Sequence, residues 1–524
     1  MRSIQLYDTT LRDGSQSEGV SFSLQDKLNF VQKLDSFNFD FIEGGFPNSN
    51  EKDAEFFNRI TGTKLQTSVV SAFGMTRRKN TAVENDTGVL SLLNAGTEII
   101  TVVGKASLFQ AAEALNIPPE ENLAMVAGTV QFLKNNGKRV FFDAEHFFDG
   151  WKDNPAYSLK ILKAAEEAGA EVIVLCDTNG GSMPKEIAAA VQEAVRSVKI
   201  PIGIHVHNDC GLAAANSLAA VENGASQVQG TINGIGERTG NTDLITVAAN
   251  LSLKYSGQYS VLKPESVEQL TELSRYVYEM LNWQIPGNTP YVGKSAFAHK
   301  GGMHVSAINK NPALYEHIDP AAVGNERRIL ISELSGRSNI IARTRNLKID
   351  LSPSAINDIL DEVVSKENQG YQYEAADGSF DLIVRKCTNT FTEHFKRLSY
   401  HIYVEADADG VLNTVATVKL QVNSKDGAII RHEVAEGDGP VNALDAAMRK
   451  ALLPYFEVLA EMRLIDFKVR VVNSEAATEA AVRVIVESGD KESVWSTIGA
   501  SENVIEASWI ALADSIEYKL NKQV

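Results

Sequence analysis

The sequence predicts an α/β protein with three parts: a (β/α)₈ barrel of the TIM type, helical linker subdomains, and an α+β carboxy-terminal domain with an internal duplication. A short apolar strand, a loop and an amphipathic helix recur from residue 1 to about 255, which is typical of a barrel with parallel strands. Residues 256–379 are irregular and mostly helical. Across residues 380–524, strand-like segments that end in a helix occur twice, which indicates a duplication.

Eight short apolar segments are the expected barrel strands. They are Ser3–Asp8, Phe39–Gly44, Leu65–Ala72, Glu98–Val103, Arg139–Ala144, Glu171–Asp177, Ile200–His207 and Gln227–Ile232. The helices expected between them include Leu24–Phe37, Ala156–Ala168, Pro184–Val195 and Leu212–Asn223. A doubly wound open sheet is the alternative, but it prefers a glycine fingerprint after its first strand. Here that strand runs into TTLRDGSQ, and the glycines of GIGERTG do not match GxGxxG.

The section after the barrel predicts a helical linker that reaches back over the barrel mouth. Its expected helical pieces are Pro264–Trp283, Ser295–Ile308, Ala321–Gly324 and Pro353–Asn368. A loop rich in proline and glycine, IPGNTPYVG, separates the first two pieces.

The carboxy-terminal section predicts two similar halves. The first half has Ser399–Glu405, Val415–Val422, Ile429–Val434 and the helix Asn442–Leu453; the second has Asp466–Val472, Ala480–Glu487, Ser493–Thr497 and the helix Asn503–Leu520. Asn442 and Ser501 are the expected N-caps of the two helices. Exposed amides at the helix starts could receive a small carboxylate. The alternative is a dimerisation domain with ordinary helix caps.

Composition excludes several partner classes. The net charge of −17 argues against nucleic acid or an anionic membrane surface as the main partner. No apolar run has the ~18 residues that suggest a membrane span. The three cysteines, Cys176, Cys210 and Cys387, form no CxxC pair, so we expect reduced thiols in the cytoplasm.

Polar residues gather where the expected barrel strands end. Active sites of such barrels lie at the carboxyl ends of the strands, so this clustering predicts one site at that mouth. The residues are Arg12 and Asp13, Glu43, Glu145 and His146, Thr178 and Asn179, His205 and His207, and Asn233.

The segment HVHND predicts a metal site. His205 and His207 are two apart at a strand end, so their side chains face the same way. Two imidazoles with a carboxylate, Asp13, suit a divalent metal and leave positions open for catalysis. Asn241 could supply a further oxygen. The alternatives are hydrogen-bonded histidines, and an Asp13 that caps a helix or pairs with Arg238.

Other residues at the mouth have candidate roles in catalysis. Glu145 lies among phenylalanines in FFDAEHFFDG; desolvation would raise its pKa toward useful base strength, unless a salt bridge holds it. The Arg12 guanidinium could hold a carboxylate or an oxyanion, and Thr178 a substrate carboxylate. His304 and Tyr315 reach the site only if the linker folds over the mouth. These groups suit aldol or Claisen chemistry on a keto acid, and equally metal-assisted hydrolysis.

Several motifs carry a family resemblance. LYDTTLRDGSQ, HVHND and NGIGERTGN resemble the isopropylmalate synthase and homocitrate synthase family of TIM-barrel acyltransferases. Further segments resemble its citramalate-forming branch: IEGGFPNSNEKDAEFF, AFGMTRR, GPVNALDAA and NVIEASWIALADSIEYKL. The resemblance covers nearly the whole chain.

The resemblance implies a function and residue roles. It implies condensation of acetyl-CoA with pyruvate to (R)-citramalate, in the threonine-independent route to isoleucine, by a homodimer with a carboxy-terminal regulatory domain and isoleucine as effector. The implied metal ligands (for Zn²⁺, Mn²⁺ or Mg²⁺) are Asp13, His205, His207 and Asn241. Arg12 and Thr178 would contact the keto acid, Glu145 would act as catalytic glutamate, and His304 and Tyr315 would assist.

Rival functions differ in substrate or class. One rival is a 2-isopropylmalate or homocitrate synthase with a larger 2-keto acid; Phe73, Val102 and Phe142 are the residues expected to narrow the pocket for pyruvate. Another is a metal-dependent aldolase or lyase that does not use CoA. A third is an amino-acid sensor with an inactive barrel.

Overall fold

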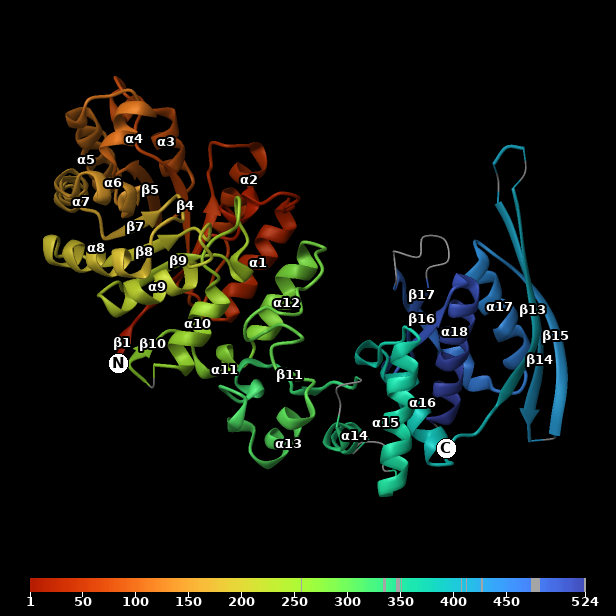
Figure 1. Ribbon diagram of the computed structural model, residues 1–524. Coiled ribbons are helices and arrows are strands. Elements are labelled where there is room, and N and C mark those ends of the chain that lie inside the picture. Colours follow the sequence, from red (N-terminus) through yellow and green to blue (C-terminus); the bar gives the residue numbers. More distant parts are fainter. Residues whose placement is uncertain are drawn as a thin grey trace. The chain divides into compact units, whose positions relative to one another are not determined.

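The computed structural model describes residues 1–255, 257–332, 336–344, 349, 351–406, 408–410, 412–425, 427–472 and 481–522. These residues divide into two compact units (Figure 1). The first comprises Met1–Phe297 and Ile318–Glu326, and the second comprises Ala298–His317 and Arg327–Val524. No helix in this part of the chain is long and apolar enough to cross a membrane.

The first unit contains the predicted barrel. Eight parallel strands close in sequence order: β2 (Gln5–Asp8), β3 (Phe41–Gly45), β4 (Val69–Met75), β5 (Ile99–Lys105), β6 (Arg139–Glu145), β7 (Val172–Asp177), β8 (Ile202–Val206) and β9 (Gln227–Gly230). The closed parallel sheet confirms the (β/α)₈ fold and excludes the open doubly wound sheet. Side chains of alternate strand residues fill the interior, where the rings of Tyr7, Phe41 and Phe141 pack together.

Helices surround the strands (Figure 1). They are α1 (Leu24–Ser36), α2 (Glu51–Ile60), α3 (Thr87–Asn94), α4 (Leu108–Glu113), α5 (Pro119–Asn135), α6 (Phe147–Asp153), α7 (Pro155–Ala168), α8 (Pro184–Ser197), α9 (Ala213–Glu222) and α10 (Leu244–Leu253). The short strands β1 (Arg2–Ser3) and β10 (Tyr259–Ser260) pair outside the barrel. The predicted helix Pro264–Trp283 is instead two helices, α11 (Pro264–Val267) and α12 (Leu270–Met280).

Strand β4 begins later than predicted because an aspartate side chain accepts hydrogen bonds from the backbone of the residues before it. The Asp35 carboxylate accepts hydrogen bonds from the backbone N–H groups of Gln66, Thr67 and Ser68, each at 2.8 Å. These donors are therefore not available to a neighbouring strand. The expected strand Leu65–Ala72 consequently moves to Val69–Met75.

The second unit begins with small elements: β11 (Ala298–His299), α13 (Gly302–Lys310), β12 (Arg328–Ile329), α14 (Arg337–Thr344), α15 (Pro353–Asn368) and α16 (Asp377–Cys387). The predicted helical piece Ser295–Ile308 is thus a short strand followed by a helix. Helices α14, α15 and α16 share an apolar cluster with Ile498.

The duplication is confirmed by two antiparallel three-stranded sheets, each followed by a helix. The first half contains β13 (Phe395–Ala406), β14 (Leu412–Ser424), β15 (Gly427–Gly437) and α17 (Pro440–Leu452); the second contains β16 (Arg463–Val471), β17 (Val482–Gly489), β18 (Val494–Ser501) and α18 (Val504–Asn521). Both helices contribute to one hydrophobic core, with Met448 and Leu512 among its members. Ala480, the first residue of the predicted segment Ala480–Glu487, lies outside the described residues.

The two predicted N-caps are wrong. Pro440 opens α17 at its first position, so the N-cap is Gly439, and Asn442 lies inside the first turn and accepts from the Asp438 N–H. The N-cap of α18 is Asn503, whose side chain accepts from two backbone N–H groups of the first turn. The Ser501 hydroxyl accepts from the Asn503 N–H instead.

Candidate active site and metal centre

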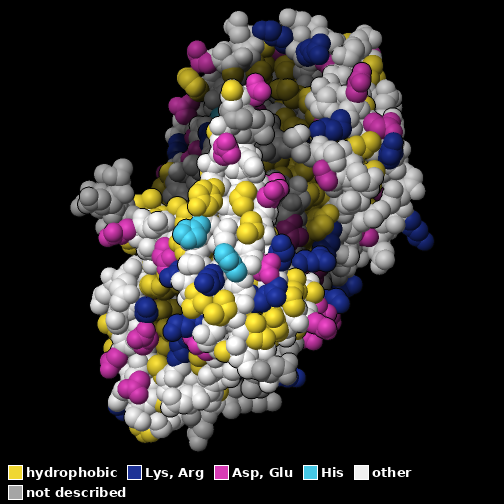
Figure 2. All heavy atoms as spheres, turned by 90° about the vertical axis from the view of Figure 1, so that its right-hand side faces the viewer, with side chains coloured by type: hydrophobic (Ala, Val, Ile, Leu, Met, Phe, Trp, Pro, Cys, Tyr) yellow, Lys and Arg dark blue, Asp and Glu magenta, His cyan; other side chains and the backbone are white. Residues whose placement is uncertain are grey.

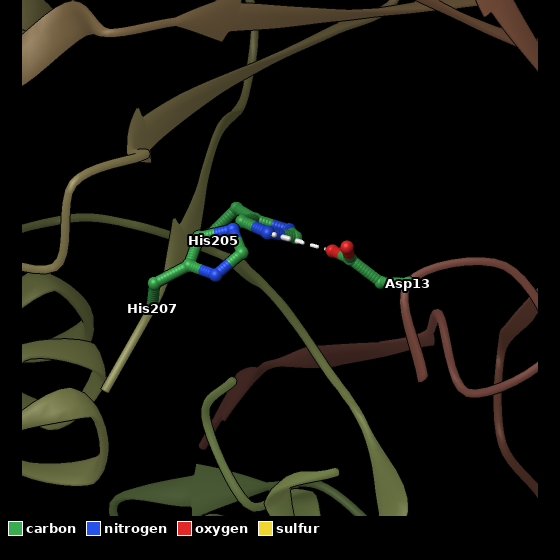
Figure 3. Close-up of side chains that lie close together, drawn as sticks. All are labelled: Asp13, His205 and His207. Carbon is green, nitrogen blue, oxygen red and sulfur yellow. Dashed lines mark ion pairs between the residues drawn. The ribbon is translucent and has the colours of Figure 1, made fainter. Parts of the chain in front are cut away.

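Two histidines and an aspartate meet at the carboxyl end of the barrel. His205 lies in β8 and His207 just beyond it, and their ring centroids are 5.2 Å apart. Asp13, in the loop after β2, turns its carboxylate toward both rings (Figure 3). The candidate donor atoms of all three buried side chains lie within 4.8 Å of one another. The structure thus brings together the three side chains that the sequence placed at one mouth.

Several buried polar atoms at this site lack ordinary hydrogen-bond partners, as the ligands of a bound cation would. Asp13 Oδ2, His207 Nδ1 and Asn241 Oδ1 are buried and, apart from His205 Nε2 at 3.1 Å from Asp13 Oδ2, have no hydrogen-bond partner among the described residues. Asn241 faces His207 in an antiparallel bridge, which places the two side chains on the same face. Buried polar atoms almost always have a partner. Two imidazoles, a carboxylate and an amide oxygen form a donor set that suits a divalent metal ion.

Neighbours of His205 set which ring nitrogen is available to a metal. Nδ1 of His205 lies 2.9 Å from Gln229 Oε1, and Gln229 Nε2 donates to Asp143 at 3.1 Å. An amide oxygen only accepts hydrogen bonds, so Nδ1 carries the proton. The lone pair of neutral His205 is therefore on Nε2, which lies 3.1 Å from Asp13 Oδ2. Such outer contacts commonly orient metal-binding histidines.

Neither of the alternative roles weighed for Asp13 is present. Asp13 begins a short 3₁₀ turn, but its side chain makes no capping hydrogen bond. Arg238 pairs with Asp209 instead, through two hydrogen bonds of 2.8 and 2.9 Å. Burial alone would raise the pKa of Asp13, but the adjacent Arg12 guanidinium and the His205 ring together hold it well below its usual range. Asp13 is therefore ionised at neutral pH, as a metal ligand must be.

Arg12 is fixed in place beside the metal candidates. Its Nε donates to Glu43 at 2.5 Å, its Nη1 lies 3.1 Å from Asp13, and its guanidinium carbon lies 4.0 Å from the centre of the Phe73 ring. Glu43 is fully buried and also accepts from the Tyr7 hydroxyl at 2.9 Å. These contacts hold the guanidinium group in one orientation, so it places a permanent positive charge at one side of the site.

Glu145 is paired rather than left unpaired among aromatic rings. Its carboxylate lies 2.6 Å from the Lys105 ammonium, and 25% of its side chain is exposed. The flanking rings of Phe142, Phe147 and Phe148 belong to the hydrophobic core. The salt bridge weighed as the alternative for Glu145 is therefore the contact that it makes.

Thr178 follows strand β7 and lies at the rim of the site. Its hydroxyl oxygen accepts from the backbone N–H of His146 at 2.8 Å. Because that bond uses only an oxygen lone pair, the hydroxyl proton remains available to a second acceptor. Thr178 can therefore donate to a carboxylate in the cavity.

The glycine-rich loop GIGERTG supports Asn241. A side chain at Gly236 would lie 2.1 Å from Asn241 Nδ2, so only glycine leaves room for this amide. Arg238 in the same loop holds both the Asp209 carboxylate and the Thr178 carbonyl. The loop thus fixes a candidate ligand and joins the ends of strands β7 and β8.

A cavity of about 320 Å³ contains these groups. Arg12, Asp13, Glu145, Thr178 and both histidines line it, together with Phe73, Val103 and Asp143. Phe73 was expected there, whereas Val102 and Phe142 are fully buried in the hydrophobic core instead. Their side chains point to the opposite face of the strands, and the cavity is lined by the next residue of each strand.

A larger cavity of about 680 Å³ adjoins the first. Both cavities are lined by Phe46, Met75, Val103, Lys105 and Glu145. The larger one is also lined by the cations Arg77, Arg78 and Lys79 and by apolar residues, Leu115 and Met125 among them. The Glu145–Lys105 ion pair therefore lies on the wall that the two cavities share.

His304 and Tyr315 belong to the second unit. Their rings stack with centroids 4.1 Å apart, and both side chains are exposed. The structure thus brings these two predicted residues to each other, and their role at the barrel mouth stays a prediction.

Sequence reasoning gave no role to Lys105, Asp143 and Gln229. Asp143 precedes Glu145 by two residues, as His205 precedes His207, and this spacing was an available signal. Burial and then the Glu43 carboxylate raise the pKa of Asp143 to about 7. Gln229 shows in QVQG as a polar residue within an apolar strand, but its contact with His205 depends on the register between β8 and β9.

Comparison with known proteins identifies the family. Residues 3–277 match the HMGL-like family, residues 291–370 the homocitrate synthase post-HMGL domain-like family, and residues 374–520 the LeuA allosteric (dimerisation) domain. The (R)-citramalate synthase of Aquifex aeolicus is 47% identical over 99% of this chain and 98% of that protein. The chain belongs to the citramalate synthase family of HMGL-like proteins.

Other relatives agree with this placement. The (R)-citramalate synthase of Geobacter sulfurreducens is 46% identical over 100% of this chain and 98% of its own length. A probable 2-isopropylmalate synthase of Methanopyrus kandleri is more distant, at 32% identity over 96% of each chain.

Proposed function

We propose that the protein condenses acetyl-CoA with pyruvate and hydrolyses the thioester to give (R)-citramalate and CoA. The observation that carries the proposal is the ion pair on the shared wall of the two cavities. Glu145 there can reach a small keto acid in one cavity and the acetyl group of a larger substrate in the other. The citramalate synthases that resemble this chain over its full length support the same reaction.

The smaller cavity suits the keto acid. Asp13, His205, His207 and Asn241 would hold a divalent ion, which would supply Lewis-acid chemistry at this site. Arg12 neutralises negative charge on the same substrate, and the Thr178 hydroxyl donates to its carboxylate. The nitrogen and oxygen donors suit Zn²⁺, Mn²⁺ or Mg²⁺.

The larger cavity suits the thioester substrate. Arg78 and Lys79 carry charges that can pair with phosphates, and Leu115 and Met125 offer an apolar surface to the thiol arm. Its volume of about 680 Å³ falls within the usual range for ligand sites.

The chain's own residues account for the proton and charge movements. The Glu145 carboxylate takes a proton from the acetyl methyl group, and the carbanion forms a carbon–carbon bond with the keto carbon. Arg12 stabilises the alkoxide that develops on the former keto oxygen, and this alkoxide takes up a proton to become the product hydroxyl while Glu145 gives up the proton it removed. Water then attacks the thioester carbonyl, the carbon–sulfur bond breaks, and CoA leaves as the thiol. His304 and Tyr315 assist the proton transfers if their loop covers the mouth.

Release of free thiol with three keto acids tests the reaction. We expect the highest kcat/KM with pyruvate, and a kcat about 10²–10⁴ lower in Glu145→Gln. Preference for 2-ketoisovalerate or 2-oxoglutarate would indicate an isopropylmalate or homocitrate synthase. Keto acid turnover without thiol release would indicate an aldolase or lyase. Full inactivity of the metal-loaded protein would favour a sensor with an inactive barrel.

We also propose a homodimer built on an exposed sheet face. The outer sheet face of β13–β15 includes His401, Tyr403, Val415, Ile430, His432 and Val434, next to polar residues such as Thr417, Lys419 and Gln421. Tyr403 is 66% and Ile430 61% exposed, and hydrophobic and histidine side chains gather on the side of the molecule shown in Figure 2. Exposed apolar patches of this kind often mark interaction sites, and the LeuA-type domain is named for dimerisation.

Regulation and location complete the proposal. We propose isoleucine as an allosteric feedback effector, bound where the amide groups at the starts of α17 and α18 can receive its carboxylate. Calorimetry that shows no isoleucine binding to the full-length protein would contradict this.

The three cysteines are free thiols, which suits the reducing cytoplasm.

A further inference from the structure

The proposed reaction creates one negative charge that has no partner among the groups assigned so far. When Glu145 removes a proton from the acetyl methyl group, the electron pair of the broken carbon–hydrogen bond moves toward the thioester carbonyl, and its oxygen becomes negative. Arg12 lines the smaller cavity, where it faces the keto acid. The thioester oxygen therefore needs a hydrogen-bond donor at the wall that the two cavities share.

Lys105 is the donor that this wall offers. Among the described residues, those that line both cavities are Phe46, Met75, Val103, Lys105 and Glu145. The first three have apolar side chains, and an ionised carboxylate only accepts hydrogen bonds. The Lys105 ammonium is thus the side-chain group of the shared wall that can donate to a substrate oxygen.

Strand β5 directs Lys105 toward the cavities. Side chains two apart on a strand face the same side, so Thr101, Val103 and Lys105 share one face. The Thr101 hydroxyl lies 2.6 Å from the Tyr7 hydroxyl in the barrel interior, and Val103 lines both cavities. The Lys105 carbonyl accepts from Asn122 Nδ2 at 2.8 Å. This bond fixes the backbone at the point where the strand ends.

The Lys105 ammonium has unused hydrogen-bond donors. It carries three N–H groups, and the Glu145 carboxylate, 2.6 Å away, occupies one of them. Within the described part of the chain, Glu145 is the side-chain partner found for this ammonium. Only 14% of the Lys105 side chain is exposed, so water competes weakly for the two remaining N–H groups.

We propose that Lys105 is a catalytic residue that donates a hydrogen bond to the thioester oxygen of the acyl substrate, an inference that rests on the proposed reaction. Before reaction, the ammonium pairs with the Glu145 carboxylate. Proton transfer neutralises Glu145 and places one negative charge on the thioester oxygen, so the ammonium exchanges one anion for another. When the carbon–carbon bond forms, the electron pair leaves this oxygen and the thioester carbonyl is restored.

The same contact serves the hydrolysis step. Water attacks the thioester carbonyl carbon, and the oxygen becomes negative a second time until the carbon–sulfur bond breaks. Lys105 keeps its proton throughout and stabilises both anions. Loss of one such donor lowers kcat by about 10²–10³. We expect this loss in Lys105→Met with little change in KM for pyruvate, because Arg12 and Thr178 remain in place.

Binding of two coenzyme A derivatives tests the contact without turnover. Carboxymethyl-CoA places a carboxylate near the position of the negative oxygen, and carbamoylmethyl-CoA has the same shape without the charge. Calorimetry uses Glu145→Gln, because glutamine is neutral, as Glu145 is once it has taken the proton. We expect this variant to bind carboxymethyl-CoA about tenfold or more tightly than carbamoylmethyl-CoA. Adding Lys105→Met should abolish the preference, whereas adding Lys105→Arg, which keeps the charge, should retain most of it.

Lys79→Met is the matched control, because it removes a cation from the larger cavity away from the shared wall. In the same background it should weaken both derivatives alike and leave the preference intact. If Lys105→Met does not fold, Lys105→Gln takes its place.

Three outcomes would overturn the role of Lys105 while the proposed reaction stands. They are no preference in Glu145→Gln, a preference that survives the loss of Lys105, and an equal weakening of both derivatives on that loss. A wild-type protein that releases no thiol from acetyl-CoA with any keto acid would overturn the proposed reaction itself, and the role of Lys105 with it.

Discussion

At the scale of single residues, the chemistry of the candidate metal centre depends on neighbours from other strands. Gln229 fixes the proton of His205 on Nδ1, and Asp143 fixes Gln229 in turn. Both are buried, so water does not compete for these hydrogen bonds. Gln229 and Asp143 therefore position a candidate metal ligand, and Gln229 does so without contacting the substrate.

Gln229→Met tests this positioning role. Methionine has a similar length but offers His205 no amide acceptor, so we expect metal affinity to fall about 10–100-fold. Competition with a chelating dye measures it. Gln227→Met is the matched control, because Gln227 is buried on the same strand and neither of its amide atoms has a partner in the described structure. Equal losses in both variants would contradict the role of Gln229.

The sequence alone could predict part of the site at this scale. Asp13, His205 and His207 could be grouped because a barrel brings its strand ends to one mouth. The ion pair between Lys105 and Glu145 could not be predicted, because it joins facing residues of β5 and β6. It therefore depends on the register of these two strands. Register is set by packing across the whole sheet and leaves no local pattern.

At the scale of elements, a shift of one residue along a strand decides whether a side chain faces a cavity or the hydrophobic core. Val103 lines both barrel cavities, whereas its neighbour Val102 is fully buried on the helix-facing side of β5. The predicted barrel is confirmed, but the predicted lining residue of β5, Val102, is one position away from Val103, which lines the cavity. The run IITVV does hold one polar residue, Thr101, whose hydroxyl contacts Tyr7 in the barrel interior, so the alternation of side chains from Thr101 to Val103 was an available signal.

A pair of adjacent variants checks this assignment. Val103→Ala enlarges the keto acid cavity, so we expect kcat/KM for 2-ketoisovalerate relative to pyruvate to rise about tenfold. Val102→Ala should leave that ratio unchanged and lower the free energy of unfolding by about 2 kcal/mol. Steady-state kinetics and denaturant unfolding measure the two effects. A ratio that shifts in Val102→Ala and not in Val103→Ala would reverse the assignment.

Asp35 controls where strand β4 begins. Burial raises the pKa of its carboxyl group, but the backbone donors of Ser68, Gln66 and Thr67 outweigh this and hold the pKa below its usual value. A carboxylate with a lowered folded pKa stabilises the protein above its unfolded pKa of about 4 and loses this effect as the pH falls.

Asp35→Asn should therefore destabilise the barrel in a pH-dependent way. We expect a loss of about 1–3 kcal/mol at pH 7, with a difference from wild type that narrows as the pH falls below about 4. Thermal melting across this pH range measures it, and the exposed Glu84→Gln serves as control. A constant difference from pH 7 to pH 3 would rule out ionisation as the cause.

At the scale of the whole molecule, the outer sheet face predicts how copies of the chain associate. Val434→Lys combined with Tyr403→Lys places two charges on that face, and burying unpaired charge is costly. We expect the proposed dimer to dissociate to monomers, as measured by light scattering. Phe109→Lys, at a residue of α4 that is 62% exposed, should leave the dimer intact. A dimer that withstands the double variant would place the interface elsewhere.

The single core shared by the two sheet-and-helix halves limits how this chain can be shortened. Residues from both halves fill one interior, and Ile498 of β18 extends the contacts to α14, α15 and α16. A truncation that removed only the last half would expose core residues of α17, such as Leu444 and Met448, to water. A shortened version of the chain must therefore lose both halves as one block, because a cut between them opens this core to water.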